Sequence, residues 1–154
     1  NKVYDFGLEF FCNADGTIDF KGISLFATRG GAYLGNILAT EADKREMLSR
    51  YADLALVDSV SEHICNILSA HFKGVYEGAF GVDMMAVARE DGDGFMLHPC
   101  VELNLRRTMG HLALALTPTI AEPQRIMSIS YADKYRMRIH DTAKNLLNTS
   151  MVTP

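Results

Sequence analysis

The chain has 154 residues, of which 48% are hydrophobic and 22% are charged, which is enough for one domain with its own core. Its formal net charge of -4, from 15 Lys and Arg against 19 Asp and Glu, gives no reason to expect a nucleic-acid partner. No apolar run approaches the roughly 18 residues of a membrane-spanning helix, and a signal-peptide pattern is missing. We therefore expect a cytoplasmic protein without a membrane partner.

Domain organisation follows from the absence of linkers and from the first residues. No low-complexity tract, internal repeat or proline-rich and glycine-rich linker divides the chain. The opening NKVYDFGLEFF is strand-like at once and has no initiating Met. We therefore expect residues 1–154 to be a single domain that is a piece of a longer protein. Three cysteines without a CxxC motif are expected to be unpaired, as in a reducing compartment.

The first predicted element is a β-hairpin over about residues 4–26. Two β-prone runs, YDFGLEFFC and TIDFKGISLF, meet at Asn13-Ala14-Asp15-Gly16, where glycine suits the positive φ of a tight turn. The glycine-rich segment ATRGGAYLGN that follows, residues 27–36, is expected to be a loop.

Two helices are predicted next, over about residues 41–51 and 59–72. The second helix places five apolar side chains on one face: Val60, Ile64, Ile67, Leu68 and Phe72. Ser59 and Glu62 have the spacing of a capping box at the start of this helix, and Gly74 is placed to end it. The position of the helix start is open by about one turn.

A second hairpin is predicted over about residues 76–107, with its turn at Asp91-Gly92-Asp93-Gly94. A short helix from His111 to Leu116 is expected to end near the proline that follows it. Residues 125–141 alternate well enough for one more strand or a hairpin. The last ten residues, 145–154, are expected to be a frayed tail.

The second hairpin carries the candidate site. With a two-residue loop at Gly92-Asp93, antiparallel pairing sets Asp83 directly opposite Glu102, and Asn104 is the next residue on the same face. A loop shifted by one residue moves the partner of Asp83 to Cys100 or Asn104 but keeps the face. A bulge would break this assignment, and Pro99, which cannot donate to the ladder, is the place to expect one.

Facing carboxylates suggest a metal. Two carboxylates opposite each other on a strand pair repel, so we expect a raised pKa, a basic neighbour or a divalent cation. Two carboxylates and an amide oxygen are the hard ligands that Mg2+ prefers, and Mg2+ often takes its other ligands from phosphates. Arg106 and Arg107 follow directly and could contact a phosphate or a carboxylate.

The motifs GVDMM and ELNLR, joined by a hairpin, resemble those of the ATP-grasp superfamily over about residues 5–116. The resemblance implies an α+β fold, with an antiparallel sheet and helices packed on one face, that is the C-terminal half of an ATP-grasp domain. It implies that Asp83, Glu102 and Asn104 hold Mg2+ (or Mn2+) bridging the ATP phosphates, and that Arg106 contacts the carboxylate substrate. The implied reaction is ATP-dependent ligation of a carboxylate to an amine or thiol through an acyl phosphate.

Two further features bear on this resemblance. Lys21 and Arg29, near TRGGAY, resemble basic residues that hold phosphates or substrate in the family. Leu105 stands where the family often has proline, and the chain shows neither the glycine-rich phosphate loop nor the lysine pair that the family supplies from its earlier half. We therefore expect an N-terminal half of the same protein as a partner, and no catalysis by this fragment alone.

Three other interpretations are compatible with the sequence. The polar residues of the hairpin could be a solvated face without any ligand. His98 and Cys100 could form a zinc site with His63 or Cys65, although the latter two point to different sides of a helix. The alternative function is a non-catalytic binding or assembly domain on the same scaffold.

Overall fold

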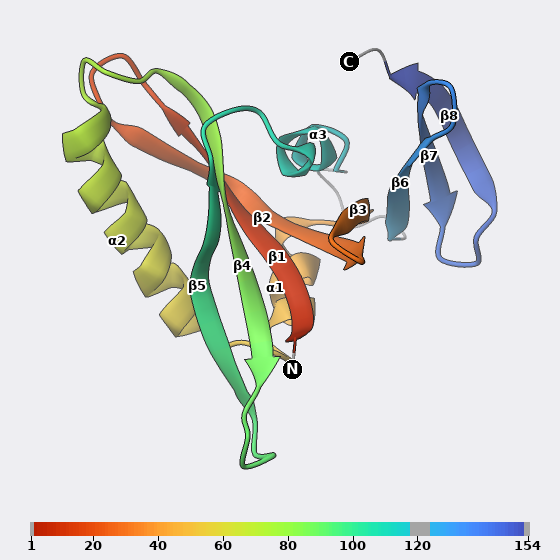
Figure 1. The fold of residues 1–154 in the computed structure, drawn as a ribbon, viewed down its shortest axis with the longest axis horizontal. Coiled ribbons are helices and arrows are strands. Elements are labelled where there is room, and N and C mark those ends of the chain that lie inside the picture. The colour runs from red at the N-terminus through yellow and green to blue at the C-terminus, as the bar shows by residue number, and fades with distance from the viewer. Residues whose placement is uncertain (1, 118–123, 153–154) are drawn as a thin grey trace.

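The structure is a computed structural model that describes residues 2–117 and 124–152. Its elements, in chain order, are β1 (Lys2–Cys12), β2 (Ile18–Arg29), β3 (Ala32–Leu38), α1 (Glu41–Leu48), α2 (Leu54–Phe72), β4 (Gly78–Ala88), β5 (Phe95–Asn104), α3 (Met109–Ala115), β6 (Arg125–Tyr131), β7 (Tyr135–Asp141) and β8 (Leu146–Val152). The strands form one antiparallel sheet in the order β5-β4-β1-β2-β3-β6-β7-β8 (Figure 1). The predicted α+β class with an antiparallel sheet is confirmed.

The first hairpin joins β1 and β2 as predicted. Its turn is closed by a hydrogen bond of 2.8 Å from the Asn13 amide to the Thr17 carbonyl, and Gly16 has a φ of +88°. The predicted loop at residues 27–36 is wrong, because β2 continues to Arg29 and β3 begins at Ala32. Gly30 and Gly31, both with positive φ, make a tight turn between these strands, so the glycines mark a hairpin and not a loop.

The main helix, α2, begins earlier than predicted. The Asp53 carboxylate accepts a hydrogen bond of 2.9 Å from the Ala55 amide and caps the helix there. The predicted capping box at Ser59 and Glu62 is wrong, because both residues lie inside the helix. The predicted end is confirmed: α2 stops at Phe72, and Gly74 follows with a φ of +73°.

Helices α1 and α2 cover one face of the sheet and bury the main core (Figure 1). This core consists of Phe6, Leu8, Phe10, Cys12, Ile23, Leu25, Leu48, Val57, Phe72, Phe80, Val82 and Met84. Phe10 stacks on Phe80 with ring centroids 5.1 Å apart. Ile67, which was predicted on the apolar face of α2, points outward and is 57% exposed.

The short helix α3 packs on the other face of the sheet. Along β1 the core residues Leu8 and Phe10 alternate with Glu9, so Glu9 points away from α2 and toward α3. A second apolar cluster of Leu38, Ala113 and Met127 fixes α3 against β3 and β6. Helix α3 ends at Ala115, and the proline near its predicted end lies outside the described residues.

The C-terminal strands extend the sheet beyond β3. β6 and β7 form the hairpin that was predicted over residues 125–141. The predicted frayed tail is wrong where the structure describes it, because β8 pairs with β7 from Leu146 to Val152. No described helix is both long enough and apolar enough to span a lipid bilayer. The three cysteines are unpaired as expected.

Candidate functional site

The β4–β5 hairpin sets Asp83 directly opposite Glu102, as predicted. The turn that produces this pairing is not the predicted one. The Arg89 amide donates to the Gly94 carbonyl at 3.1 Å and closes a loop of residues 90–93, so the two-residue loop at Gly92-Asp93 is wrong. With this loop alone, regular pairing would have placed Asp83 opposite Cys100.

A bulge in β5 restores the predicted pair. Met85 faces His98 and Asp83 faces Glu102, so only Met84 lies between the two pairs on β4, whereas residues 99–101 lie between them on β5. Pro99 is one of these residues, and its missing N–H makes an interrupted ladder the expected result. Because the bulge adds an even number of residues, Glu102 stays on the same face as Asp83.

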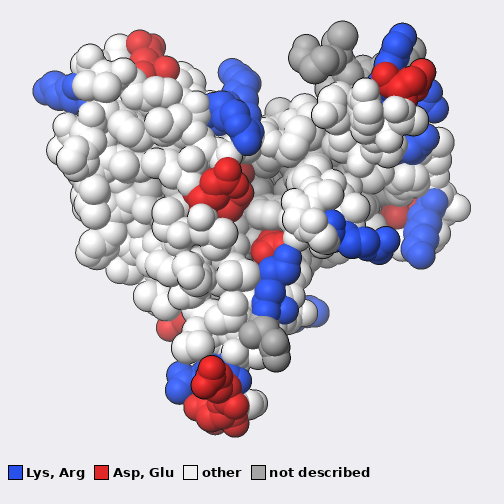
Figure 2. All heavy atoms as spheres, in the orientation of Figure 1, with Lys and Arg blue, Asp and Glu red and all other residues white. Residues whose placement is uncertain are grey.

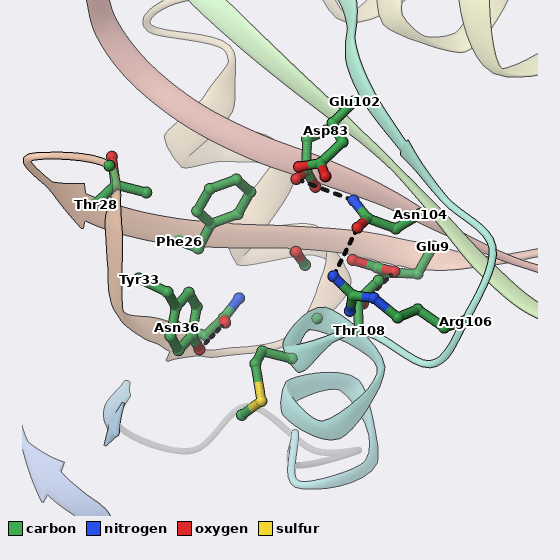
Figure 3. A pocket seen from close by; sticks show the side chains of 14 residues that line it. Glu9, Phe26, Thr28, Tyr33, Asn36, Asp83, Glu102, Asn104, Arg106 and Thr108 are labelled. Atoms are coloured by element: carbon green, nitrogen blue, oxygen red, sulfur yellow. Dashed lines mark hydrogen bonds between the residues drawn. The ribbon is translucent and has the colours of Figure 1, made fainter. Parts of the chain in front are cut away.

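A cavity of about 350 Å³ lies on this face between the hairpin, β3 and α3. Asp83, Glu102, Asn104 and Arg106 all line it, and Asp83 and Glu102 lie side by side (Figure 3). Arg106 Nη2 donates to Asn104 Oδ1 at 2.8 Å, and Asn104 Nδ2 donates to Asp83 Oδ2 at 3.3 Å. The space-filling view shows this face hollowed, with acidic atoms near its centre (Figure 2). The structure therefore brings together the four residues predicted from the hairpin.

The other two predicted residues do not line the cavity. Lys21 lies on β2 with its Nζ 3.0 Å from an oxygen of Asp19, and it is exposed. Arg29 is exposed at the end of β2, although Thr28 and Gly31 on either side of it in the sequence do line the cavity. Only Arg29 therefore lies near enough in the chain to be considered for the same site.

A third acid, Glu9, was not predicted and forms the floor of the cavity. Its side chain is 1% exposed, and Oε2 accepts a hydrogen bond of 2.7 Å from Thr108 Oγ1 and lies 2.9 Å from His111 Nδ1. The His111 Nε2 lies 3.0 Å from the Phe10 carbonyl. His111 Nδ1 also accepts a hydrogen bond of 3.3 Å from the Thr108 amide, so this nitrogen faces both a donor and the Glu9 carboxylate. Glu9 and His111 tie α3 to β1.

The environment of Asp83 raises its pKa to about 6. Burial is the largest cause, followed by the negative charges of Glu9 and Glu102, while the Asn104 hydrogen bond and the Arg106 charge act in the opposite direction. For His111, burial alone would lower the pKa, but the hydrogen bonds to Glu9 and to the Phe10 carbonyl and the charge of Glu9 raise it. The acids of the site are thus only partly compensated by the described side chains.

The raised pKa of Asp83 predicts a stabilising substitution. The pKa of Asp83 is higher in the folded than in the unfolded protein, so folding favours the protonated form of Asp83. The charged form therefore lowers the free energy of unfolding, and this loss is complete above about pH 6. In EDTA, Asp83→Asn should raise the free energy of unfolding by roughly 1 kcal/mol at pH 8, and this gain should shrink as the pH falls from 6 toward 4. Urea denaturation at several pH values measures it, with the exposed Asp93→Asn as the control. An equal effect at pH 8 and pH 4 would contradict the argument.

The donor set of the site suits a hard cation. Asp83 and Glu102 offer carboxylate oxygens and Asn104 an amide, the ligand types that Mg2+ prefers. Asn104 turns its nitrogen toward Asp83 and its oxygen toward Arg106, so the amide would have to turn to bind a metal through oxygen. Within residues 2–117 and 124–152, no three His, Cys, Asp or Glu side chains are arranged to hold a metal ion. The site therefore fits a cation that takes further ligands from phosphate or water.

Comparisons with known proteins give matches only among solved structures. No protein-family model and no curated protein matches the chain. The chain is similar to a protein assigned to the ATP-grasp superfamily from Archaeoglobus fulgidus, at 15% identity and a TM-score of 0.45. It is also similar to N5-carboxyaminoimidazole synthetase from Staphylococcus aureus complexed with ADP, at 13% identity and a TM-score of 0.47.

These alignments cover 91% and 84% of this chain but 46% and 35% of the other two. The chain therefore spans less than half the length of either protein. Both TM-scores are below 0.5.

Proposed function

We propose that the cavity binds a divalent cation and the phosphates of ATP, as the metal-binding part of an ATP-dependent carboxylate ligase of the ATP-grasp type. The observation that carries this proposal is the convergence of residues from two sequence motifs on one cavity: Asp83 from GVDMM, and Glu102, Asn104 and Arg106 from ELNLR. The raised pKa of Asp83, which is caused first by burial and then by the charges of Glu9 and Glu102, supports the proposal, because a bound cation would offset all three effects.

Each residue has a proposed role. Asp83, Glu102 and the Asn104 amide would hold Mg2+ or Mn2+, which when bound neutralises charge on the phosphates. Arg106, held by Asn104 at 2.8 Å, would bind the carboxylate substrate or its acyl phosphate. The carboxylate oxygen would attack the γ-phosphorus of ATP, so that ADP leaves and an acyl phosphate forms. An amine or thiol would then attack the acyl carbon and lose its proton, and phosphate would leave. Arg29 remains a candidate phosphate contact. Lys21 does not, because it pairs with Asp19 away from the cavity.

Trapping with hydroxylamine tests this function in the full-length protein. Hydroxylamine attacks an acyl phosphate and gives a hydroxamate, whichever amine or thiol the protein normally uses. We expect a panel of carboxylic acids to contain at least one that gives Mg2+-dependent hydroxamate and ADP. Arg106→Ala should lower hydroxamate formation by about 100-fold, because it removes the charge that orients the reacting carboxylate. The exposed neighbour, Arg107→Ala, is the matched control.

The alternative of a non-catalytic binding or assembly domain gives a different result. That alternative predicts no hydroxamate from any acid and no effect of Arg106→Ala on the quantity of ADP formed. Nucleotide binding that is indifferent to Mg2+ would contradict the metal site itself.

A further inference from the structure

Two polar atoms on the floor of the cavity lack partners. Glu9 and Ser24 are 1% and 3% exposed, and both side chains line the cavity. Glu9 Oε2 is used by Thr108 and His111, but Glu9 Oε1 and Ser24 Oγ make no hydrogen bond with any described residue. No fully enclosed side-chain N or O atom of the described residues is left without a partner, so these two oxygens are open to the cavity.

Two glycines bring these oxygens together. A side-chain carbon built on Gly110 would lie 1.8 Å from Glu9 Oε1 and 2.6 Å from Ser24 Oγ, and one built on Gly7 would lie 3.1 Å from each. The Gly7 point also lies 3.4 Å from Asp83 Oδ1. The absence of side chains on Gly7 and Gly110 therefore lets Glu9 Oε1 and Ser24 Oγ lie close together against the backbone of both glycines, with Asp83 Oδ1 near them at Gly7.

The acceptor oxygens on the floor of the cavity favour a positively charged group that donates hydrogen bonds. A carboxylate oxygen can only accept hydrogen bonds, and leaving it buried without a donor is costly. Three acids, Glu9, Asp83 and Glu102, line the cavity against one arginine, so an anion placed beside Glu9 without a bound metal cation is disfavoured. A primary ammonium carries three donors in a tetrahedral arrangement and matches converging acceptors better than a planar guanidinium.

We propose that Glu9 and Ser24 form a subsite for a primary ammonium group of a substrate. The subsite adds to the proposed ligase function and depends on it for its role. The ammonium could belong to the carboxylate substrate or to the attacking amine before it loses its proton. Glu9 is a binding residue here, held in place by Thr108 and His111.

Binding of ethylammonium to the full-length protein in EDTA tests the subsite without ATP or metal. Titration by saturation-transfer NMR should show binding that Glu9→Gln weakens at least tenfold and Ser24→Ala by about threefold to tenfold, as expected for a charged and a neutral hydrogen bond. Ser24→Ala removes a hydroxyl without a partner among the described residues, so it keeps the test valid if Glu9→Gln fails to fold. The exposed Glu90→Gln is the control for loss of one negative charge.

Three results would overturn the subsite. These are no ethylammonium binding by the unaltered protein, equal binding of ethanol, or unchanged affinity in a folded Glu9→Gln or Ser24→Ala variant. Glu9-dependent ethylammonium binding without any hydroxamate would reject the ligase and keep the subsite.

The hydroxamate assay then identifies the source of the ammonium. If Glu9→Gln lowers hydroxamate formation from amino acids but not from the matching acids without an amino group, the ammonium belongs to the carboxylate substrate. If hydroxamate formation is unchanged while ethylammonium binding is lost, the ammonium belongs to the attacking amine.

Discussion

Glu102→Gln in the full-length protein is expected to reduce Mg2+-dependent nucleotide turnover by about 100-fold or more. Glu102 lies opposite Asp83 across the hairpin, and both line the cavity. The substitution keeps the shape of the side chain but removes the charge that a divalent cation needs, so the cation binds more weakly and the phosphate charge is less neutralised.

Two measurements check this result. Titration with Mn2+ followed by electron paramagnetic resonance reports the metal affinity, and ADP formation reports turnover. Glu90→Gln is a matched control, because Glu90 lies in the exposed turn of the same hairpin. Equal Mn2+ affinity for Glu102→Gln and the control would remove Glu102 from the proposed metal site.

Gly110→Ala is expected to lower the free energy of unfolding by about 3 kcal/mol. The added carbon would lie 1.8 Å from Glu9 Oε1, so either the buried Glu9 side chain would have to leave Thr108 and His111 or α3 would have to move away from β1. Alanine favours a helix over glycine by about 1 kcal/mol, which is too little to offset this overlap. Urea denaturation measures the loss. Gly7→Ala, whose nearest contacts are 3.1 Å, should cost less and serves as the graded comparison.

A double-mutant cycle shows whether Glu9 is the cause. In a Glu9→Ala background the nearest atom to the added carbon is gone, so Gly110→Ala should cost at least about 1 kcal/mol less than in the unaltered protein. An equal cost in both backgrounds would show that another contact opposes the substitution, such as that of Ser24 Oγ, which lies 2.6 Å from the added carbon.

The pairing of Asp83 with Glu102 was predicted correctly although the turn was not. The predicted loop was two residues long, but the structure has a loop of residues 90–93 and a compensating bulge at residues 99–101. The face of the strand was the safer part of the prediction, because any even change in register preserves it. Pro99 marked where the ladder is irregular, because a missing N–H is visible in sequence.

Glu9 was missed although its sequence carried the same signal as Glu102. It stands in FGLEFF, where an acid amid apolar residues needs a partner. The role of Glu9 depends on the pairing of β1 with β4, which sets Gly7 opposite Asp83 and Glu9 opposite Gly81. These strands are separated in the chain by β2, β3 and two helices, and no local pattern specifies which distant strands pair.

The sequence by itself determined the two hairpins, the end of α2 and the polar face of the β4–β5 hairpin, because each depends on contacts between residues close in the chain. The sequence pattern did not indicate the strands β3 and β8, because it predicts a loop and a frayed tail at those residues. Only the tertiary structure decided that Glu9, Ser24 and α3 close the cavity around Asp83. The physical reason is that this closure depends on strand order and on the close approach of Gly7 and Gly110 to distant side chains, and both are properties of the packed sheet.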